Sequence, residues 1–432
     1  GLTKLVNVIV RKSKDLLGEV SAPSSKAYTH RTLVAALLSN GTSEISNPLV
    51  SDDIEATLRS VEAFGAEVET QKGCWKAKGV KSLKVPENPI DCGESGATLR
   101  FMIPVAALAS GSSILTFGAS LEKRPIAPLL QSLSQLGIES SLQLREGSSF
   151  IEIRGRGIRG GRTSIRGDIS SQFISGLLFA CPKAREETKI VIAPPLESRS
   201  YVKMTMEVLA KHGIKASTSS DFERLSIPPN QEYNPCNHEV PGDFSSAAFL
   251  LAAAAITSSK VKVRNLDHHT TQGDRAILNI LKEMGSKMWI GDKFVEVEGR
   301  KLDAVDIDAR DTPDLVPVYA VLACYSKGTS KIYNAKRLRY KESDRLASLH
   351  GELKKMGAKI VMRKDGLTIR GPCIMRGATV NPHNDHRIVM ACAIAALNAV
   401  GETNIHNSEC VNKSYPRFFD DICSLGANVV GR

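Results

Sequence analysis

The chain has 432 residues, of which 42% are hydrophobic and 24% charged, and its formal net charge is +11. This length allows two or three domains with full cores, and the composition excludes a disordered or fibrous chain. The positive charge favours anionic partners, but an aromatic content of 5% is low for nucleic-acid stacking surfaces, so small anionic metabolites fit better.

Other classes are disfavoured by what the sequence does not contain. Its apolar runs are shorter than a membrane span, and its start, a glycine, does not resemble a secretory signal, so we expect a cytoplasmic protein. Nine cysteines are scattered singly, which favours reduced thiols over a disulfide framework. Neither these cysteines nor the histidines show metal-ligand spacing, and His268-His269 is more typical of a loop. We therefore expect no metal.

A short phrase recurs six times: one residue, a glycine, a small or apolar residue and then a β-rich stretch. Neighbouring glycines are 72, 76, 72, 72 and 69 residues apart. This even spacing predicts six copies of one structural unit, although ordinary helix caps in an unrelated α/β chain remain the alternative. The copies are Phe64-Gly65-Ala66, Leu136-Gly137-Ile138, His212-Gly213-Ile214, Met284-Gly285-Ser286, Met356-Gly357-Ala358 and Leu425-Gly426-Ala427.

Within each unit, a helical stretch ends at the glycine and two short strands follow. Glycine just past the last helical turn supplies the left-handed backbone that ends a helix. Alternating runs at residues 150–153, 294–297 and 367–369 predict the closing strands. One unit is therefore strand, helix, strand, helix and two strands. The sixth copy is short after Gly426, so we expect residues 6–10 to supply its closing strand.

The turn before the first helix of each unit carries hydroxyl, carboxylate or amide side chains. Such residues are the expected N-caps, and capping alone explains any single turn. As a set, helix N-termini favour anions, and Lys26, Arg31, Arg100 and Arg387 would add full charges for phosphates and carboxylates. The turns are residues 24–31, 93–100, 167–172, 242–246, 311–314 and 384–387.

Two further charged clusters precede second helices, at residues 122–125 and 339–345. Lys341 and Glu342 lie four and three residues before Arg345, so on a helix all three would share a face. The helical stretch itself is expected from Asp344 to Met356. A solvated ion-pair face is the usual meaning of such a run and remains the alternative.

Taken together, these motifs resemble the 5-enolpyruvylshikimate-3-phosphate synthase (3-phosphoshikimate 1-carboxyvinyltransferase) family over nearly the whole chain. The order of the motifs is distinctive, above all the Lys-Glu-x-Asp-Arg and Asn-Asp-His-Arg sequences. The matching residues are Ser25, Lys26, His30 and Arg31; Gly96 and Arg100; residues 124–126 and 170–172; Gly242, Asp243, Ser245 and Ser246; residues 341–345 and 384–387; and Lys413 and Pro416.

The resemblance implies an α/β fold of the enolpyruvyl transferase type, a two-domain inside-out α/β barrel built from six βαβαββ units, three per domain. It implies an N-terminal domain over residues 23–241 and a C-terminal domain from residues 1–22 and 242–432, with the active site in the cleft between them. The two chain crossings between the domains fall near Pro23 and Pro241. A break in regular secondary structure at these prolines is what a hinge requires. We expect the domains to close on substrate.

The implied reaction transfers the enolpyruvyl group of phosphoenolpyruvate to the 5-hydroxyl of shikimate 3-phosphate and releases phosphate, in the shikimate pathway. It needs a base, an acid and cations for two phosphates and two carboxylates. The family pattern assigns catalysis to Asp314 as base and Glu342 as acid, with Lys341 as a rival proton carrier and Lys26 bridging both substrates. We expect no cofactor, no nucleic-acid or membrane partner, and a monomer.

The family pattern also assigns the binding residues. Those for shikimate 3-phosphate are Lys26, Ala27, Arg31, Ser170, Ser171, Gln172, Ser198, Tyr201, Asp314 and Lys341. Those for phosphoenolpyruvate are Lys26, Gly96, Arg124, Gln172, Arg345, Arg387 and Lys413.

The chain departs from the family pattern at a few positions. Ala27 stands where serine is frequent, and Glu94 and Phe101 differ from the usual residues near the phosphoenolpyruvate pocket. These positions, with Ala97, leave the response to glyphosate open, and Ala27 leaves the affinity for shikimate 3-phosphate open.

Three rival interpretations remain. The related transferase that acts on UDP-N-acetylglucosamine carries a cysteine in the loop before its Arg-Pro, and residues 118–124 contain none. A basic nucleic-acid-binding protein would show salt-dependent retention and no turnover. A catalytically inactive relative is disfavoured because Asp314, Lys341 and Glu342 are all present.

Overall fold

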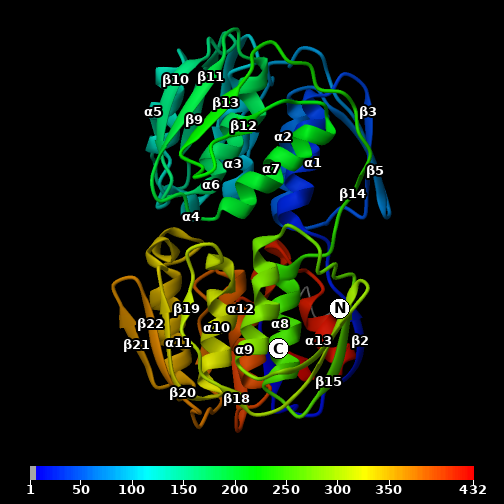
Figure 1. Ribbon diagram of the computed structural model, residues 1–432, viewed down its shortest axis with the longest axis vertical. Helices are drawn as coiled ribbons and strands as arrows, with labels where there is room; N and C mark the ends of the chain where they lie inside the picture. The colour runs from blue at the N-terminus through cyan, green and yellow to red at the C-terminus, as the bar shows by residue number, and fades with distance from the viewer. Residues whose placement is uncertain (1–5) are drawn as a thin grey trace. The chain divides into compact units, whose positions relative to one another are not determined.

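A computed structural model describes residues 6–432 of the chain and divides it into two compact units (Figure 1). The middle unit is Ser24–Val240, and the terminal unit combines the segment that ends at Pro23 with Pro241–Arg432. Residues 1–5 of the expected segment 1–22 lie outside the described residues. The architecture is a mixed α/β fold in which six separate sheets are covered by helices, and no sheet within residues 6–432 closes on itself.

The middle unit contains three four-stranded sheets. In spatial order they are β14 (His238–Glu239), β3 (Thr42–Ser46), β5 (Cys74–Lys78) and β4 (Glu67–Gln71); β6 (Ile90–Asp91), β7 (Gly111–Thr116), β9 (Phe150–Gly155) and β8 (Glu139–Gln143); and β10 (Gly161–Arg166), β11 (Thr188–Ala193), β13 (Arg224–Ile227) and β12 (Ser217–Thr218). The helices are α1 (Lys26–Leu38), α2 (Asp52–Ala63), α3 (Gly96–Ala106), α4 (Ala119–Glu122), α5 (Ala127–Gln135), α6 (Ser171–Ala180), η2 (Cys181–Lys183) and α7 (Arg199–Lys211).

The terminal unit repeats this plan. Its sheets are β2 (Leu17–Ser21), β15 (Lys260–Arg264), β17 (Phe294–Glu298) and β16 (Lys287–Gly291); β18 (Leu302–Asp303), β20 (Ser326–Tyr333), β22 (Gly366–Gly371) and β21 (Ile360–Arg363), with β19 (Ile307–Asp308) also on β20; and β23 (Thr379–Val380), β24 (Glu402–Ile405), β1 (Val8–Arg11) and β25 (Asn428–Gly431). The helices are α8 (Phe244–Ala255), η3 (Gly273–Ala276), α9 (Ile277–Glu283), η4 (Pro313–Leu315), α10 (Val316–Cys324), η5 (Lys336–Tyr340), α11 (Arg345–Lys355), α12 (His386–Ala396), η6 (Ser408–Lys413) and α13 (Phe418–Ser424).

All six sheets share one pairing pattern. The first strand runs parallel to the second, as β6 does to β7, and the next two pairs are antiparallel; β19 adds one more parallel pair with β20. All six recurring glycines have positive φ angles, which is the left-handed backbone predicted for the ends of the helices: Gly65, Gly137, Gly213, Gly285, Gly357 and Gly426. Strand β1 lies between β24 and β25 in an antiparallel arrangement, with Val8 opposite Ile405 and Gly431.

The strands next to the two crossings do not pair with the sheet of the helix that follows them in the chain. Strand β2 directly precedes α1, yet it pairs in parallel with β15 in the terminal unit. Strand β14 directly precedes α8, yet it pairs in parallel with β3 in the middle unit. At each crossing, the chain therefore completes the first strand of a sheet in one unit and then forms the first helix of the other unit.

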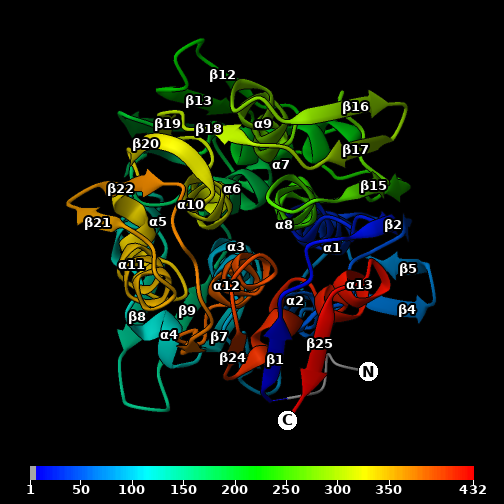
Figure 2. The same ribbon diagram turned by 90° about the horizontal axis from the view of Figure 1, so that it is seen from below.

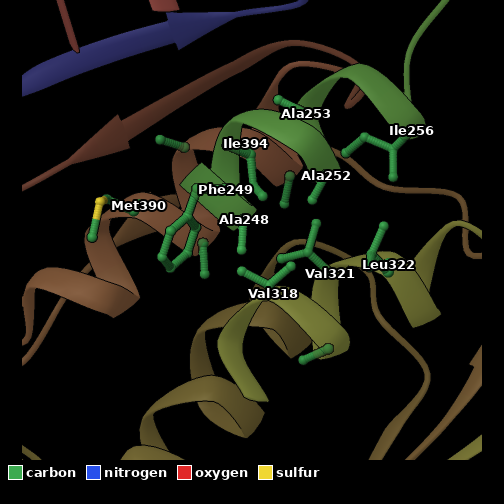
Figure 3. Close-up of a cluster of buried hydrophobic side chains, with 14 of the residues drawn as sticks. Ala248, Phe249, Ala252, Ala253, Ile256, Val318, Val321, Leu322, Met390 and Ile394 are labelled. Carbon is green, nitrogen blue, oxygen red and sulfur yellow. The ribbon is translucent and has the colours of Figure 1, made fainter. Parts of the chain in front are cut away.

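Each unit has a core of helices that are apolar all round. Every residue of α8, α10 and α12 is buried, whereas α11 buries only one face. Figure 3 shows Ala248 and Ala252 of α8 facing Val318 and Val321 of α10, and in the middle unit α3 packs on α1 and α6. The small side chains allow the helices to approach closely. The turns that begin these helices are thereby held rigidly, and they carry the predicted site residues.

A buried polar chain fixes β14 to the middle unit. Tyr28 Oη lies 3.3 Å from His238 Nδ1, and His238 Nε2 lies 2.7 Å from His212 Nε2. His212 Nδ1 donates to the Asn234 carbonyl at 2.7 Å, so its Nε2 accepts from His238. Burial lowers the pKa of both histidines, that of His238 to about 3, and the nearby Lys211 charge lowers both further. Both rings are therefore neutral in the folded protein.

We predict that this chain makes the fold acid-sensitive. His238 binds a proton in the unfolded state below pH 6.5 but in the folded state only near pH 3, so between these values it removes about 1.4 kcal/mol of unfolding free energy per pH unit. The lowered pKa of His212 adds a loss in the same direction. In urea denaturation at pH 7.5 and pH 5, His238→Gln should lose less stability on acidification than the wild type. The exposed His269→Gln should behave like the wild type, and an unchanged slope in His238→Gln would contradict the assignment.

Candidate active site

The predicted N-caps form in five of the six first turns. Ser25, Ser95, Ser170, Asp243 and Asp385 each accept a backbone N–H of their own helix. Thr312, before η4, makes no such side-chain bond. Capping thus explains these side chains locally, and the chemistry of each turn comes from the charged residues around it.

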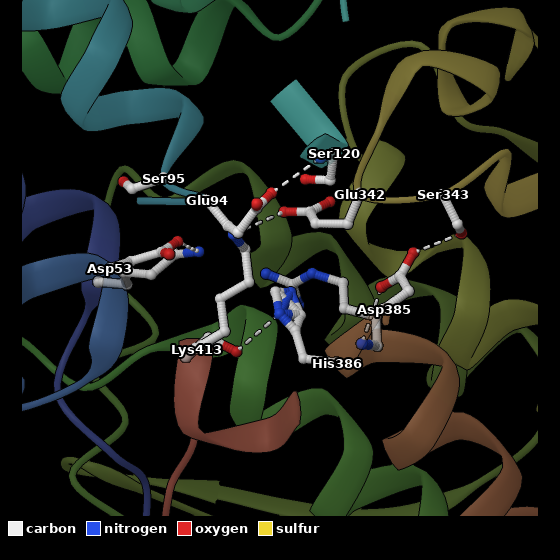
Figure 4. A network of polar contacts seen from close by, with 12 residues as sticks. Asp53, Glu94, Ser95, Ser120, Glu342, Ser343, Asp385, His386 and Lys413 are labelled. Atoms are coloured by element: carbon white, nitrogen blue, oxygen red, sulfur yellow. Dashed lines mark hydrogen bonds and ion pairs between the residues drawn. The ribbon is translucent and has the colours of Figure 1, made fainter. Parts of the chain in front are cut away.

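Lys26 begins α1 and forms an ion pair with a residue that the motifs did not reveal. Its Nζ lies 2.9 Å from Asp53 Oδ2, and Asp53 is 5% exposed in the first turn of α2 (Figure 4). The carboxylate orients the lysine and offsets its charge. The only sequence signal for Asp53 was a carboxylate near a helix start, which is common.

Arg31 is buried on the same helix and bonds mainly to protein oxygens. Its Nε donates to Thr205 Oγ1 at 2.8 Å and its Nη1 to the Ala27 carbonyl at 2.9 Å. The guanidinium carbon lies 5.0 Å from the ring centre of Phe101 and 5.7 Å from that of Tyr201. Burial lowers the pKa of Arg31 to about 10, so it remains a cation at neutral pH.

Arg100 of α3 joins two predicted binding segments of the middle unit. Its Nη1 donates to Ser170 Oγ and Gln172 Oε1, each at 3.0 Å, and its Nη2 donates to the Pro125 carbonyl at 3.0 Å. Its guanidinium also lies over the Phe173 ring. The start of α6 and the turn at residues 124–125 are therefore held by one side chain.

Arg124 packs directly against the backbone of Gly96. A Cβ atom at position 96 would lie 2.8 Å from Arg124 Nη1, so glycine permits this approach. Glu94 Oε2 accepts the Ser120 N–H at 3.1 Å, which anchors the start of the loop that leads to Arg124.

The other predicted residues of the middle unit gather at helix starts. Ser171 is the first residue of α6 and is buried, with Ser170 as the cap. Ser198 has a left-handed backbone with φ of 56° before α7, and Tyr201 lies in the first turn of that helix. These starts present backbone N–H groups of the kind that bind phosphate.

In the terminal unit, three carboxylates surround one buried arginine, and two of them, Glu342 and Asp385, are labelled in Figure 4. Arg345 is 1% exposed; its Nε donates to Asp385 Oδ2 at 2.9 Å, its Nη2 to Glu342 Oε2 at 2.6 Å and its Nη1 to Asp314 Oδ1 at 3.3 Å. Burial alone would lower the pKa of Arg345, but these carboxylates raise it above the ordinary value. Asp385 also accepts a hydrogen bond from Ser343 Oγ at 2.9 Å.

Other cations of the predicted set lie next to these carboxylates. Arg387 Nη2 is 3.7 Å from Asp314 Oδ2, and Lys413 Nζ is 4.0 Å from Glu342 Oε1. Lys341 acts electrostatically on Asp314. The terminal unit therefore brings Asp314, Lys341, Glu342, Arg345, Arg387 and Lys413 together, as the sequence motifs suggested.

Two aspartates of this cluster have opposite pKa shifts. Burial would raise the pKa of Asp314, but Arg387, Lys341 and Arg345 outweigh burial and hold it well below its ordinary value. Asp274 in η3 was not singled out from the sequence; burial and the charge of Asp314 raise its pKa to about 7. Ser245 Oγ donates to Asp274. Asp314 is thus ionised at neutral pH, beside a carboxyl that readily keeps a proton.

The helical stretch expected from Asp344 to Met356 forms as α11 (Arg345–Lys355), but the shared helical face considered for Lys341, Glu342 and Arg345 does not. Residues 341–344 are not helical, because α11 begins at Arg345 and Asp344 is its N-cap, with its side chain accepting the Ala347 N–H at 3.1 Å. Glu342 reaches Arg345 from the turn before the helix. Because Asp344 caps α11, the helix does not extend back towards residue 341. A turn instead brings Glu342, three residues before Arg345, within reach of the guanidinium.

Three side chains of this cluster carry ligand atoms that a metal ion could use. Ligand atoms of Glu342, Asp385 and His386 lie within 4.8 Å of one another. Arg345 bonds to both carboxylates of this group, so its guanidinium occupies the place that a cation would take. The residues therefore fit a permanent organic cation better than a metal.

We predict that Arg345→Ala lowers the unfolding free energy by about 3–5 kcal/mol, because it leaves buried carboxylates without their partner. The matched control is Arg11→Ala, which breaks an exposed pair with Glu402 at 2.8 Å and should cost less than about 1 kcal/mol. Urea denaturation at neutral pH measures both. Equal losses of unfolding free energy in the two variants would show that the buried cluster stabilises the fold no more than an exposed ion pair does.

The fold and these clusters define an α/β protein whose helix starts and cations are built to hold small anions that carry phosphate and carboxylate groups. Residues 10–422 match the family described as EPSP synthase (3-phosphoshikimate 1-carboxyvinyltransferase). The chain belongs to this family.

Relatives and solved structures agree with this assignment. The chain is 46% identical to a 3-phosphoshikimate 1-carboxyvinyltransferase of Methanocella arvoryzae, over 98% of this chain and 100% of that protein. It is 43% identical to the protein of the same name from Methanocaldococcus jannaschii, over 98% and 99%. An EPSP synthase structure from Acinetobacter baumannii aligns with a TM-score of 0.82 and 26% identity, over 98% and 99%. The enolpyruvyl transferase NikO of Streptomyces tendae, at 18% identity, over 98% of each chain, and a TM-score of 0.74, shares the fold.

Proposed function

We propose that the chain performs the reaction of its family with the residues gathered in the two units. That reaction moves the 1-carboxyvinyl group of phosphoenolpyruvate to shikimate 3-phosphate and releases phosphate, as a step of the shikimate pathway towards aromatic amino acids. The observation that carries the proposal is the Arg345 cluster, where a base candidate, an acid candidate and three further cations meet. Full-length relatives with this activity in their names support it.

In the proposed mechanism, Asp314 takes the proton of the 5-hydroxyl as its oxygen attacks carbon 2 of phosphoenolpyruvate. Glu342 supplies a proton to the methylene carbon, and Lys341 is the alternative carrier. The resulting tetrahedral adduct carries a methyl group. It then loses phosphate and returns one methyl proton to the group that supplied it, which re-forms the carbon–carbon double bond as the enol ether of the product. Both steps need stabilisation of developing charge on phosphate and carboxylate, which fixed cations provide.

The lowered pKa of Asp314 makes it a weak base before substrates bind. Substrate phosphates and carboxylates would draw on Arg387 and Lys341, the cations that lower this pKa. Anion binding would therefore raise the pKa of Asp314 and strengthen it as a base. This gives a physical reason for proton abstraction to wait for both substrates.

The binding roles follow the predicted sets. Shikimate 3-phosphate would bind through its phosphate at Ser170, Ser171 and Ser198 and through its carboxylate at Arg31, with Ala27, Gln172 and Tyr201 nearby. Phosphoenolpyruvate would bind Arg124 beside Gly96, together with Gln172, Arg345, Arg387 and Lys413. Lys26 would leave Asp53 and bridge both substrates. The short Arg124–Gly96 approach supports a binding surface built for a compact ligand.

We also infer the finer architecture and setting. The six sheets share one pairing pattern, and the six recurring glycines have positive φ. These features support a βαβαββ repeat that occurs three times in the middle unit and three times in the terminal unit of an inside-out α/β barrel. Within residues 6–432, none of the helices is long and apolar enough to cross a bilayer. A cytoplasmic monomer that needs neither metal nor cofactor fits these features.

The direct test is phosphate release from phosphoenolpyruvate without added metal. We expect release only when shikimate 3-phosphate is also present, because the leaving phosphate departs from the adduct of both substrates. UDP-N-acetylglucosamine in place of shikimate 3-phosphate should give none. Release with the sugar nucleotide alone would reassign the acceptor, and binding of RNA without turnover would support the nucleic-acid alternative.

Substitution of the acid and base should separate chemistry from binding. We expect Asp314→Asn and Glu342→Gln to lower kcat by about 10²–10⁴-fold, because each keeps its shape but loses proton transfer. Substrate affinities, measured by calorimetry, should change far less. Glu402→Gln, an exposed carboxylate paired with Arg11, is the matched control and should leave kcat unchanged; wild-type turnover in Glu342→Gln would remove Glu342 from the acid role.

A further inference from the structure

The cysteines of the chain differ sharply in their chemical setting. All nine lie within the described residues 6–432 and none is in a disulfide. Burial raises the pKa of Cys92 and Cys181 to about 12 and that of Cys392 well above its ordinary value, so these thiols are protonated and unreactive at neutral pH. Cys373 is the exception, and it lies beside Cys324.

The geometry brings these two cysteines within bonding range. Cys324 is the last residue of α10, and Cys373 follows β22 by two residues. The Cys373 N–H donates to the Cys324 carbonyl at 2.7 Å. Standard backbone dimensions then limit their Cα separation to at most about 6.6 Å, which lies inside the range that disulfides span. The Cys324 thiol also forms a hydrogen bond with the Cys373 sulfur.

The two sulfurs have different protonation states. The Cys324 hydrogen bond outweighs burial and, with the Lys359 N–H at 3.4 Å, lowers the pKa of Cys373 to about 6. The same hydrogen bond, together with burial, raises the pKa of Cys324 well above its ordinary value. When Cys373 is protonated, its thiol donates instead to the Arg370 carbonyl at 3.1 Å. Cys373 is 8% exposed, and the next residue, Ile374, is 87% exposed, so a small oxidant can approach it.

We propose that Cys373 and Cys324 form a thiol–disulfide modification site for small hydroperoxides, in which Cys373 reacts first and Cys324 resolves the product. The site lies within the terminal unit and takes no residue from the predicted binding or catalytic sets.

The chemistry balances with a hydroperoxide as the oxidant. The Cys373 thiolate attacks one peroxide oxygen, the O–O bond breaks, and hydroxide or alkoxide leaves, which forms a sulfenic acid. Oxidation removes the negative charge next to Cys324, so its thiol loses a proton more easily. The Cys324 sulfur then attacks the sulfenic sulfur, the S–S bond forms, the S–O bond breaks, and the oxygen leaves as water.

The bond would tie the end of α10 to the strand β22. Gly371, at the end of β22, already packs on the backbone of this helix end, since a Cβ there would lie 2.3 Å from the Ser326 carbonyl oxygen and 2.6 Å from that of Ala323. The cross-link therefore needs little backbone movement. It would convert a reactive thiolate into a reversible disulfide and protect it from irreversible oxidation.

The test is peroxide treatment of the folded full-length chain, followed by peptide mapping by mass spectrometry without reductant. We expect a cross-linked peptide that joins positions 324 and 373, lacks two hydrogens and is separated by dithiothreitol. Iodoacetamide should alkylate Cys373 of the untreated protein with a half-maximal rate near pH 6.

Two variants make the test specific. Cys324→Ser keeps a hydrogen-bond donor but cannot form the disulfide, so Cys373 should gain two or three oxygens instead. Cys392→Ser removes a nearby buried thiol and should leave the disulfide yield unchanged. Peroxide-treated wild type with both thiols intact, or with a cross-link between other cysteines, would overturn the proposal, as would alkylation of Cys373 with a midpoint at the ordinary thiol pKa.

Discussion

The terminal unit depends on one arginine that neutralises three carboxylates in a buried place. Asp314, Glu342 and Asp385 come from the starts of three different helices, and each bonds to Arg345, which is 1% exposed. Charges removed from water are tolerated only when they are paired and hydrogen-bonded. The guanidinium therefore fixes the relative positions of η4, the turn before α11 and the start of α12. The residues proposed for proton transfer lie on those segments, so the same guanidinium fixes their positions as well.

The buried helices and the charge balance act together. Because α8, α10 and α12 are apolar on every side, their N-terminal turns cannot shift without disturbing the core. Of the cations that lower the pKa of Asp314, Arg387 lies in the first turn of α12, Arg345 begins α11, and Lys341 lies just before α11. A site of this kind stores excess positive charge at fixed points, and anionic substrates complete it. The middle unit follows the same logic, with Arg100 holding the segments around Ser170 and Pro125.

The sequence could predict the features that depend only on residues close together in the chain. The six glycines have positive φ because only a left-handed residue ends these helices economically, and five N-caps formed because capping involves neighbouring residues. Asp53 and Asp274 were missed because their partners, Lys26 and Ser245, lie 27 and 29 residues away. The implied domain bounds put β2 and β14 in different domains, but their partner strands were not predicted, because a strand's local sequence does not say which sheet it joins. Residue spacing alone could not tell whether Lys341, Glu342 and Arg345 share a helical face, because a turn satisfies the same spacing.

The central claim is that fixed cations keep Asp314 ionised until substrates arrive. The most direct measurement is an infrared pH titration of the ligand-free protein, with the Asp314→Asn spectrum subtracted to isolate one carboxylate. We predict that this carboxylate protonates below the ordinary aspartate pKa, and that it protonates at higher pH once both substrates or their inert analogues are bound. Protonation at or above the ordinary aspartate pKa in the ligand-free protein would contradict the account.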